Sequence, residues 1–295
     1  MNVIIKNLMK KGIVKGRSEL LSYSEIKELE NLILKSKNKH LKDGEVSQNI
    51  IGIDKRIDEI LEKIVINPEV QNILLKLLGK NYLIRQIFAR YNEPDDIGLT
   101  LHQDSIGEAG LMVLLNNQPD GSTVFFPGSQ LIPSEKHLAQ KVSWNSLRLI
   151  NMTKYFLKTA TGNAGDYYYF LHRTWHGRTP GNSDNTKISL FFDIFPVSAK
   201  RKDFLFDSEY NSKIDFDLVS QPNLKKMISR KDYHTAVEIY EKSENATFSL
   251  SMKTSNFSQI FNNKLFFAYT IIKIIFLEIL FFPISIKRFF KFLWK

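Results

Sequence analysis

The chain has 295 residues, 43% of them hydrophobic and 24% charged, so it can bury a globular core and disorder is not expected. Its formal net charge of +10 fits either a lysine-rich solvated surface or attraction to an anionic partner such as lipid or an acidic substrate. The absence of cysteine excludes disulfides, thiolate metal sites and cysteine nucleophiles, and it is compatible with a cytoplasmic protein.

Residues 1–80 have helical periodicity. Ser22 and Glu25 have the spacing of a capping box, and apolar residues follow on one helix face. A second helix is predicted over residues 53–64, and a third over residues 68–79, with proline in its first turn and glycine at its end. We expect these helices to pack against a sheet and to carry no chemistry.

Residues 81–197 have a different character, with short runs rich in β-branched and aromatic residues. Turn residues such as proline, glycine, aspartate and asparagine separate these runs. The predicted strands are Tyr82–Tyr91, Leu99–Asp104, Leu111–Asn116, Ser122–Phe126, Ser146–Met152, Asp166–His172 and Lys187–Phe195. Many short strands with turn signals between them are typical of a sandwich or jelly roll.

The C-terminal third divides into two parts. Residues 198–263 are polar and mixed, with a helix predicted around residues 233–242 and a linker over residues 256–263. Residues 264–295 are rich in phenylalanine, isoleucine and leucine, and basic residues lie at the end. The sequence therefore predicts a mixed extension followed by a separate hydrophobic and basic segment.

The end of the predicted strand Leu99–Asp104 has the spacing of a metal site. Side chains alternate across a strand, so His102 and Asp104 point the same way and can reach one metal ion. A second histidine from a distant strand would complete a face of two histidines and one carboxylate, which is associated with non-haem Fe(II) oxygenases. His176 is the preferred second histidine, and His172 is the alternative.

Four segments in order resemble the phytanoyl-CoA dioxygenase-like family of Fe(II)- and 2-oxoglutarate-dependent oxygenases. The resemblance covers about residues 80–197. The segments are His102-Gln103-Asp104, Gly121 to Gln130, Gly165-Asp166, and His176-Gly177 followed by a polar turn. The resemblance implies a double-stranded β-helix (jelly roll, cupin-like) core, Fe(II) held by His102, Asp104 and His176, 2-oxoglutarate as co-substrate, and O2.

The predicted co-substrate anchor departs from this family. The family places an arginine about eleven residues beyond the distal histidine to bind the far carboxylate of 2-oxoglutarate, and this chain has Lys187 there. Lysine can pair with a carboxylate, but as a point charge without the guanidinium fork. Ser189 lies on the same strand face and could add a hydroxyl. Arg178 is a nearer alternative, and we prefer Lys187.

The resemblance implies a hydroxylase acting on an organic substrate. Halogenases of the family have a small residue in place of the metal carboxylate, so Asp104 argues for hydroxylation. Two other functions stay open: a non-catalytic jelly-roll binding module, and a metalloenzyme of the same fold that does not use 2-oxoglutarate. No zinc finger, RNP-type motif or basic recognition helix is present, so no nucleic-acid partner is predicted.

The hydrophobic and basic segment 264–295 allows three interpretations. Lys273 and Glu278 make a membrane-spanning helix costly, whereas aromatic residues mixed with lysine and arginine suit a membrane surface. We prefer an interfacial anchor over a buried or dimer-forming helix and over a transmembrane span. The enzyme would then be cytoplasmic and peripheral at the cytoplasmic face of the membrane. Its substrate would be a small molecule, or a lipid or lipid-linked glycan. The oligomeric state cannot be read from the sequence.

Overall fold

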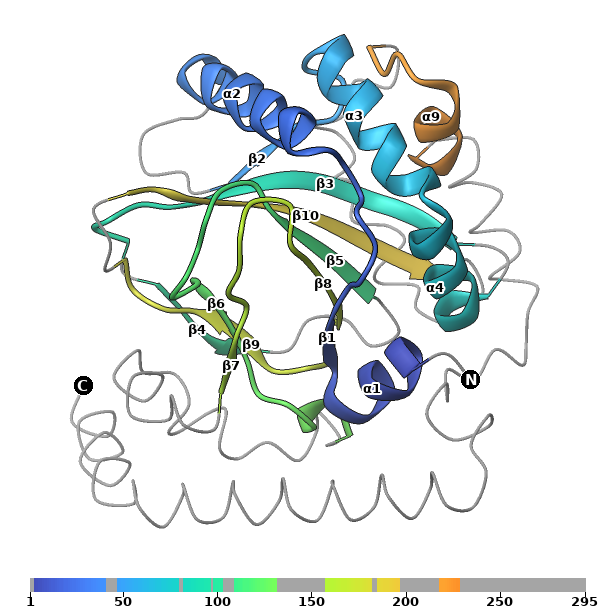
Figure 1. Cartoon of the computed structure of the whole chain (residues 1–295), viewed down its shortest axis with the longest axis vertical. Helices are drawn as coiled ribbons and strands as arrows, with labels where there is room; N and C mark the ends of the chain where they lie inside the picture. Colours follow the sequence, from blue (N-terminus) through green and yellow to red (C-terminus); the bar gives the residue numbers. More distant parts are fainter. Residues whose placement is uncertain are drawn as a thin grey trace, which may run out of the picture.

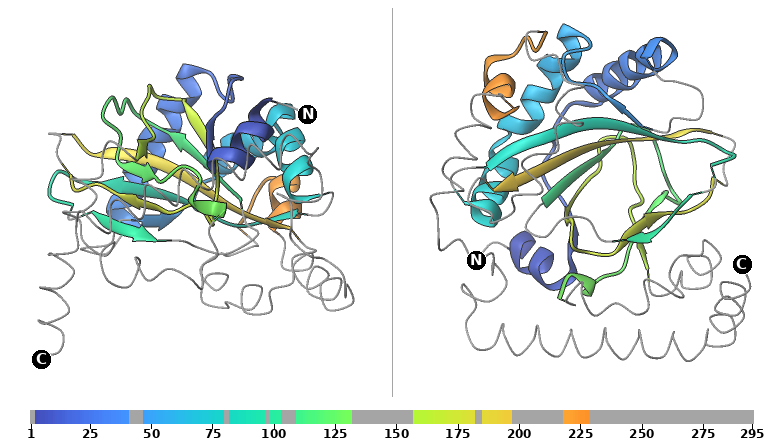
Figure 2. Two further views of the ribbon diagram at one scale, coloured as in Figure 1. Left: turned by 90° about the horizontal axis from the view of Figure 1, so that it is seen from below. Right: turned by 180° about the vertical axis from the view of Figure 1, so that it is seen from behind.

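A computed structural model describes residues 3–40, 47–79, 82–96, 98–102, 109–131, 157–181, 185–196 and 218–228. In these residues two antiparallel β-sheets face each other, and helices cover the outer face of the larger sheet (Figure 1). Figure 2 shows the same layers from below and from behind. The predicted mainly β, jelly-roll core with flanking helices is confirmed.

The larger sheet has the strand order β1-β8-β5-β10-β3-β2. Its strands are β1 (Ile13–Lys15), β2 (Ser47–Asn49), β3 (Tyr82–Asn92), β5 (Ala109–Leu114), β8 (Tyr167–Leu171) and β10 (Lys187–Pro196). The smaller sheet has the order β4-β9-β6-β7. Its strands are β4 (Leu99–His102), β6 (Thr123–Phe125), β7 (Lys158–Thr159) and β9 (His176–Arg178).

Strand β10 contributes to two different interiors. Its outward residues pack in the core beneath the helices: Ile188, Leu190, Phe192 and Ile194. Phe191 instead packs in the core between the two sheets. Because successive side chains of a strand point to opposite faces, Lys187, Ser189 and Asp193 also face the space between the sheets. Polar groups from the longest strand pair thus reach the interior of the jelly roll.

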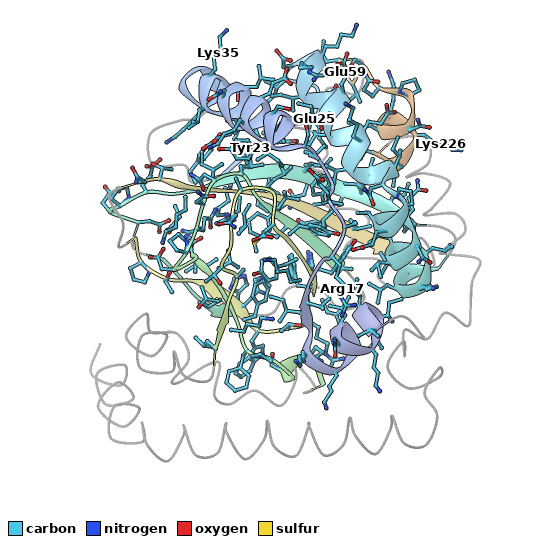
Figure 3. The ribbon with its side chains drawn as sticks, in the orientation of Figure 1. Arg17, Tyr23, Glu25, Lys35, Glu59 and Lys226 are labelled. Carbon is cyan, nitrogen blue, oxygen red and sulfur yellow. The ribbon has the colours of Figure 1, made fainter. Side chains whose placement is uncertain are left out.

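The helical layer contains α1 (Val3–Lys11), α2 (Tyr23–His40), α3 (Lys55–Ile66), α4 (Pro68–Leu78) and α9 (Pro222–Ile228). Three of these helices, α2, α3 and α4, match the predicted periodicity, and α1 and α9 join them. The capping box is present, since the backbone N–H of Ser22 donates to the Glu25 carboxylate at 2.9 Å and the N–H of Glu25 donates to the Ser22 hydroxyl at 3.4 Å. Polar side chains such as Lys35 and Lys226 extend away from this layer (Figure 3).

Two short strands lie in the segment 1–80 that the sequence predicts to be helical. Strand β1 pairs with β8, and β2 pairs with β3, so this segment completes both edges of the larger sheet. Each has three residues, which is too short for an alternating pattern to be recognised. The predicted strand 146–152, the predicted helix 233–242 and the segment 264–295 lie outside the described residues.

Candidate metal centre

The two histidines of the predicted metal face lie side by side in the smaller sheet. The register of β4 and β9 pairs His102 with His176, and their ring centroids are 4.5 Å apart with an interplanar angle of 52°. On the other side of β9, Phe125 of β6 is the register partner of His176. The sequence separates the two histidines by more than 70 residues, and strand pairing brings them together.

The orientation of the His176 ring suits a metal ligand. Its Nδ1 lies 2.8 Å from the backbone carbonyl oxygen of Thr174. A carbonyl oxygen only accepts, so this hydrogen bond requires the proton on Nδ1, and in the neutral tautomer with that proton the lone pair is on Nε2. Metal-binding histidines are commonly oriented in this way by a partner on the other ring nitrogen.

Asp104, the third predicted ligand, lies outside the described residues. Within the described ranges, no three His, Cys, Asp or Glu side chains gather into a group that could hold a metal. A complete metal face would therefore need a ligand from outside the described residues, and Asp104, two residues after His102, is the one that the sequence predicts.

His172, the alternative second histidine, faces a different partner. It follows strand β8 in the larger sheet, and its ring stacks on Phe170 with a centroid distance of 5.2 Å. Its Nε2 lies 3.2 Å from the carboxylate of Asp193 on β10. The ring centroid of Phe170 also lies 5.8 Å from that of His176, so the Phe170 ring lies between the imidazoles of His172 and His176. The structure thus places His176 against His102 in the smaller sheet, and His172 against the Asp193 carboxylate of its own, larger sheet.

A cavity of about 210 Å³ lies between the sheets and is open to both histidines. Its walls combine aromatic side chains, three arginines and a carboxylate. The lining residues are Arg85, Gln86, Phe88, Arg90, Leu99, His102, Thr123, Phe170, His172, His176, Gly177, Arg178, Phe191 and Asp193. A concave site with aromatic walls and a few convergent polar groups is typical of small-molecule binding.

Register and ring contacts give this cavity two ends. Phe170 and Phe191 of the larger sheet lie at the level of His176, because Phe170 contacts both His176 and Phe191. On β10, Ser189 and Lys187 precede Phe191, and the Lys187 ammonium contacts the carbonyl oxygen of Gly121 just before β6. Thr123 at the start of β6 is the register partner of Arg178, so Arg178 lies on the Lys187 side of the histidines. Asp193, beyond Phe191 on β10, and its partner His172 lie on the other side.

The predicted co-substrate residues are all buried, but they differ in what they contact. The Lys187 ammonium donates to the Asp120 carboxylate at 2.9 Å and to the Gly121 carbonyl at 2.7 Å. The Ser189 hydroxyl accepts from the Gln118 side chain at 3.2 Å. Neither Lys187 nor Ser189 is among the cavity-lining residues, whereas Arg178 is.

A cluster around Asp193 forms the other end of the cavity. Its carboxylate accepts from the side chains of Gln86 and Arg85, the latter at 3.2 Å. Burial by itself raises the pKa of Asp193, but the charge and hydrogen bond of His172, together with Arg85 and Gln86, lower it overall. Asp193 is therefore a buried carboxylate at neutral pH, held by Arg85 and Gln86 of the neighbouring strand β3 and by His172, which follows β8.

No family model matches the chain, and no curated protein matches it. Solved structures do match. HygX from Streptomyces hygroscopicus, solved with nickel and 2-oxoglutarate bound, has a TM-score of 0.54 and 11% identity, covering 69% of this chain and 93% of HygX. SnoK, a non-haem α-ketoglutarate-dependent carbocyclase from nogalamycin biosynthesis, has a TM-score of 0.53 and 16% identity, covering 72% of this chain and 90% of SnoK. The chain shares the fold of these enzymes.

A third structure with this fold is the epimerase SnoN, solved in complex with Fe3+, α-ketoglutarate and nogalamycin RO. Its TM-score is 0.50 at 16% identity, covering 66% of this chain and 83% of SnoN. At such identities the likeness establishes the fold alone. The resemblance to the phytanoyl-CoA dioxygenase-like family within this fold stays a prediction.

Among the cavity-lining residues that the sequence reasoning missed are its charged and amide side chains outside the predicted set: Arg85, Gln86, Arg90 and Asp193. Asp193 had a readable signal, because it is a lone charge within the apolar run of β10. Arg90 had none, because its inward position depends on its register with Ser189. Among the helices that the structure describes, none has the length and apolar character needed to cross a membrane.

Proposed function

We propose that this protein is an Fe(II)- and 2-oxoglutarate-dependent oxygenase with iron bound by His102, Asp104 and His176. The pairing of His102 with His176 at a cavity, in a fold shared with such enzymes, carries this proposal. The imidazole donors and the spacing of Asp104 fit a face of two histidines and one carboxylate, which leaves positions for co-substrate and O2.

Iron bound there would supply the activation of O2, coupled to conversion of 2-oxoglutarate to succinate and CO2. The residues of this chain would do the rest. His176 is oriented by the Thr174 carbonyl, and the phenylalanines around the histidines exclude water. The protein would thus contribute ligands, orientation and a dry pocket, and the metal the difficult chemistry.

Cations at one end of the cavity support 2-oxoglutarate as co-substrate. Arg178 and Arg90 line that end from opposite sheets, and Lys187 and Ser189 lie just beyond it. The co-substrate's keto-acid end would bind at the histidines, and its distal carboxylate would point toward these groups. Because guanidinium and ammonium groups pair well with carboxylates, this arrangement suits a dicarboxylate.

The organic substrate would meet the end with Arg85, Gln86, His172 and Asp193, on the far side of the histidines from the co-substrate. Hydroxylation is the outcome we propose, since Asp104 fills the position that is a small residue in halogenases. SnoK and SnoN are described as a carbocyclase and an epimerase, so proteins with this fold give other outcomes too. A lipid or lipid-linked glycan as substrate, and membrane contact through 264–295, stay predictions.

Succinate formation tests the proposal. The full chain with Fe(II), ascorbate and 2-oxoglutarate should form succinate, and His102→Ala and His176→Ala should reduce it to background. Arg56→Gln, on the outer helical layer, is the matched control and should keep the wild-type rate. Fe(II) binding without any 2-oxoglutarate binding would favour a different metalloenzyme, and binding of neither would favour a non-catalytic module.

A further inference from the structure

Arg178 is a buried arginine in the wall of the candidate site. It is 6% exposed and lies two residues after His176 on β9, so both side chains project from the same strand face. Two residues along a strand correspond to about 6.6 Å, which is comparable with the short carbon chain between the carboxylates of 2-oxoglutarate. A ligand bound at His176 could therefore reach Arg178.

Asp96 holds one edge of the Arg178 guanidinium. Its Oδ2 lies 2.8 Å from Arg178 Nε, and its Oδ1 accepts from Nη2 at 3.0 Å. The Asp96 side chain is only 2% exposed. The same carboxylate accepts from the Asn92 side chain at 2.9 Å and from the Gly98 N–H at 2.7 Å. Arg178 thus has a fixed orientation, since its partner is itself held in place.

The charge of Asp96 is secure at neutral pH. Burial by itself raises the pKa of Asp96, but hydrogen bonds from Asn92, Gly98 and Arg178, together with the Arg178 charge, lower it below its usual value. Asp96 also lies between β3 and β4, and its carbonyl oxygen accepts from the Gly181 N–H at 2.7 Å. It therefore ties the segment before His102 to the segment after β9.

The other edge of the guanidinium has no such partner. Arg178 Nη1 is buried and has no hydrogen-bond acceptor within the described residues. A buried donor without an acceptor is costly, and a charged one more so. Because Arg178 lines the cavity, a ligand carboxylate there could accept from Nη1. Arg90 lines the same cavity from the facing sheet, so this carboxylate would meet a second guanidinium.

We propose that Arg178 binds the distal carboxylate of 2-oxoglutarate and that Asp96 is the positioning residue that aims it. This rests on the proposed function. Lys187 is then a structural residue, since its ammonium already contacts the Asp120 carboxylate and the Gly121 carbonyl and it does not line the cavity. The anchor would then lie on β9, the strand that carries His176, and not on β10, the strand that begins at Lys187.

Calorimetric titration of the Ni(II)-loaded full chain with 2-oxoglutarate tests the assignment. Arg178→Gln should weaken 2-oxoglutarate binding on the order of 100-fold, as expected for loss of one partner of a buried charge pair. Asp96→Asn should weaken it about 10- to 100-fold, as a residue acting through its neighbour. Lys187→Met should have a smaller effect than either, and Arg56→Gln should have none.

A second ligand separates anchoring from general damage. The probe 2-oxobutyrate has the keto-acid end and lacks the distal carboxylate, so its affinity should be the same in wild type and in the Arg178 and Asp96 variants. Affinity for Ni(II) alone should also be unchanged. If Arg178→Gln does not fold, Arg178→Lys keeps a charge opposite Asp96 and should still lose 2-oxoglutarate affinity, because it lacks the fork.

Coupling between the two residues completes the test. With Arg178→Lys already present, Asp96→Asn should cause little further loss, because it acts through Arg178. Equal loss of 2-oxobutyrate and 2-oxoglutarate, additive effects of the two substitutions, or a larger effect of Lys187→Met would overturn the assignment and leave the proposed function standing. Failure of the wild-type Ni(II) protein to bind 2-oxoglutarate would overturn both.

Discussion

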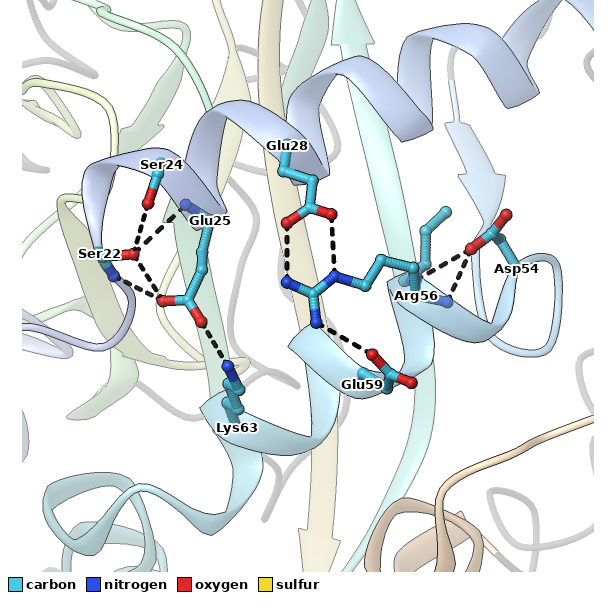
Figure 4. Close-up of polar contacts among 9 residues, drawn as sticks. Ser22, Ser24, Glu25, Glu28, Asp54, Arg56, Glu59 and Lys63 are labelled. Carbon is cyan, nitrogen blue, oxygen red and sulfur yellow. Dashed lines mark hydrogen bonds and ion pairs between the residues drawn. The ribbon is translucent and has the colours of Figure 1, made fainter.

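Two arginine–carboxylate contacts of similar geometry lie in different regions of the molecule. Between α2 and α3, Arg56 donates to both oxygens of Glu28 at 2.8 Å each (Figure 4). These two side chains are 40% and 41% exposed. In the cavity wall, Arg178 contacts both oxygens of Asp96, and those side chains are 8% and 2% exposed. In both contacts the Nε and Nη2 atoms of the arginine face the two carboxylate oxygens, and the two pairs differ in their exposure to solvent.

The difference in exposure indicates that the two contacts have different roles. An exposed ion pair is screened by water and contributes little to stability, so the helix contacts in Figure 4 serve mainly to align two elements. A buried pair loses the hydration of both groups, and apolar residues of the same volume would often be as stable. Arg178–Asp96 and Arg85–Asp193 are therefore expected to be kept for the site and not for the stability of the fold.

The largest expected effect on the free energy of unfolding is that of a substitution at Asp193. Asp193→Ala leaves Arg85 and His172 buried without their shared carboxylate, and it should cost about 3–5 kcal/mol in the free energy of unfolding. Urea unfolding of the full chain measures this. Asp193→Leu, with two partners replaced as well (Arg85→Met and His172→Phe), should recover part of the loss. A loss below 1 kcal/mol would mean that water reaches this end of the cavity, and the comparison would fail.

An intermediate effect is expected at Lys187. Lys187→Met removes the buried donor to the Gly121 carbonyl, and an unsatisfied buried acceptor costs about 1–3 kcal/mol. Asp120, which also contacts the Lys187 ammonium, has a side chain that is 46% exposed, so water can solvate that carboxylate. Thermal unfolding checks the value. A cost as large as that of Asp193→Ala would show that Asp120 is not solvated as its exposure implies.

A smaller and pH-dependent effect is expected at Glu25 in the helix seam. A hydrogen bond from Lys63, then those from Ser22, lower the pKa of Glu25 from 4.5 to about 2. Because the folded pKa lies below the unfolded one, the stabilisation is present above about pH 4.5 and is lost as the pH falls toward 2. Stability of wild type and Glu25→Gln measured across this window should converge at the acid end. Parallel curves would contradict the assignment.

The smallest effect is expected at the exposed pair itself. Arg56→Gln removes the contacts to Glu28 and Glu59, and solvent replaces them. The melting temperature should therefore be the same as that of wild type within error. The difference between the two melting temperatures should also stay near zero when salt is added. A clear fall would show that exposed contacts hold the helical layer more firmly than their solvation suggests.

Local patterns in the sequence were enough to predict the jelly-roll class and the helices α2 to α4. They also indicated His102 and His176 as candidate metal ligands, and the structure places these two side by side. Capping and alternation depend on neighbours within a few residues, so they can be read directly. The contacts of Arg178 with Asp96 and of Asp193 with His172 could not be predicted, since they depend on which distant strands pair and in what register. Strands β1 and β2 were missed because three residues are too few to show the alternation of a strand.

Fe(II) binding by three proteins tests the central claim, that His102 and His176 form the iron site. Anaerobic Fe(II) titration should give tight binding in wild type and in His172→Ala, and it should give loss of that binding in His176→Ala. Thermal unfolding of each variant checks that it is folded. If His176→Ala binds Fe(II) as tightly as wild type while a folded His172→Ala does not, the iron site lies on the other wall of the cavity and the account is wrong.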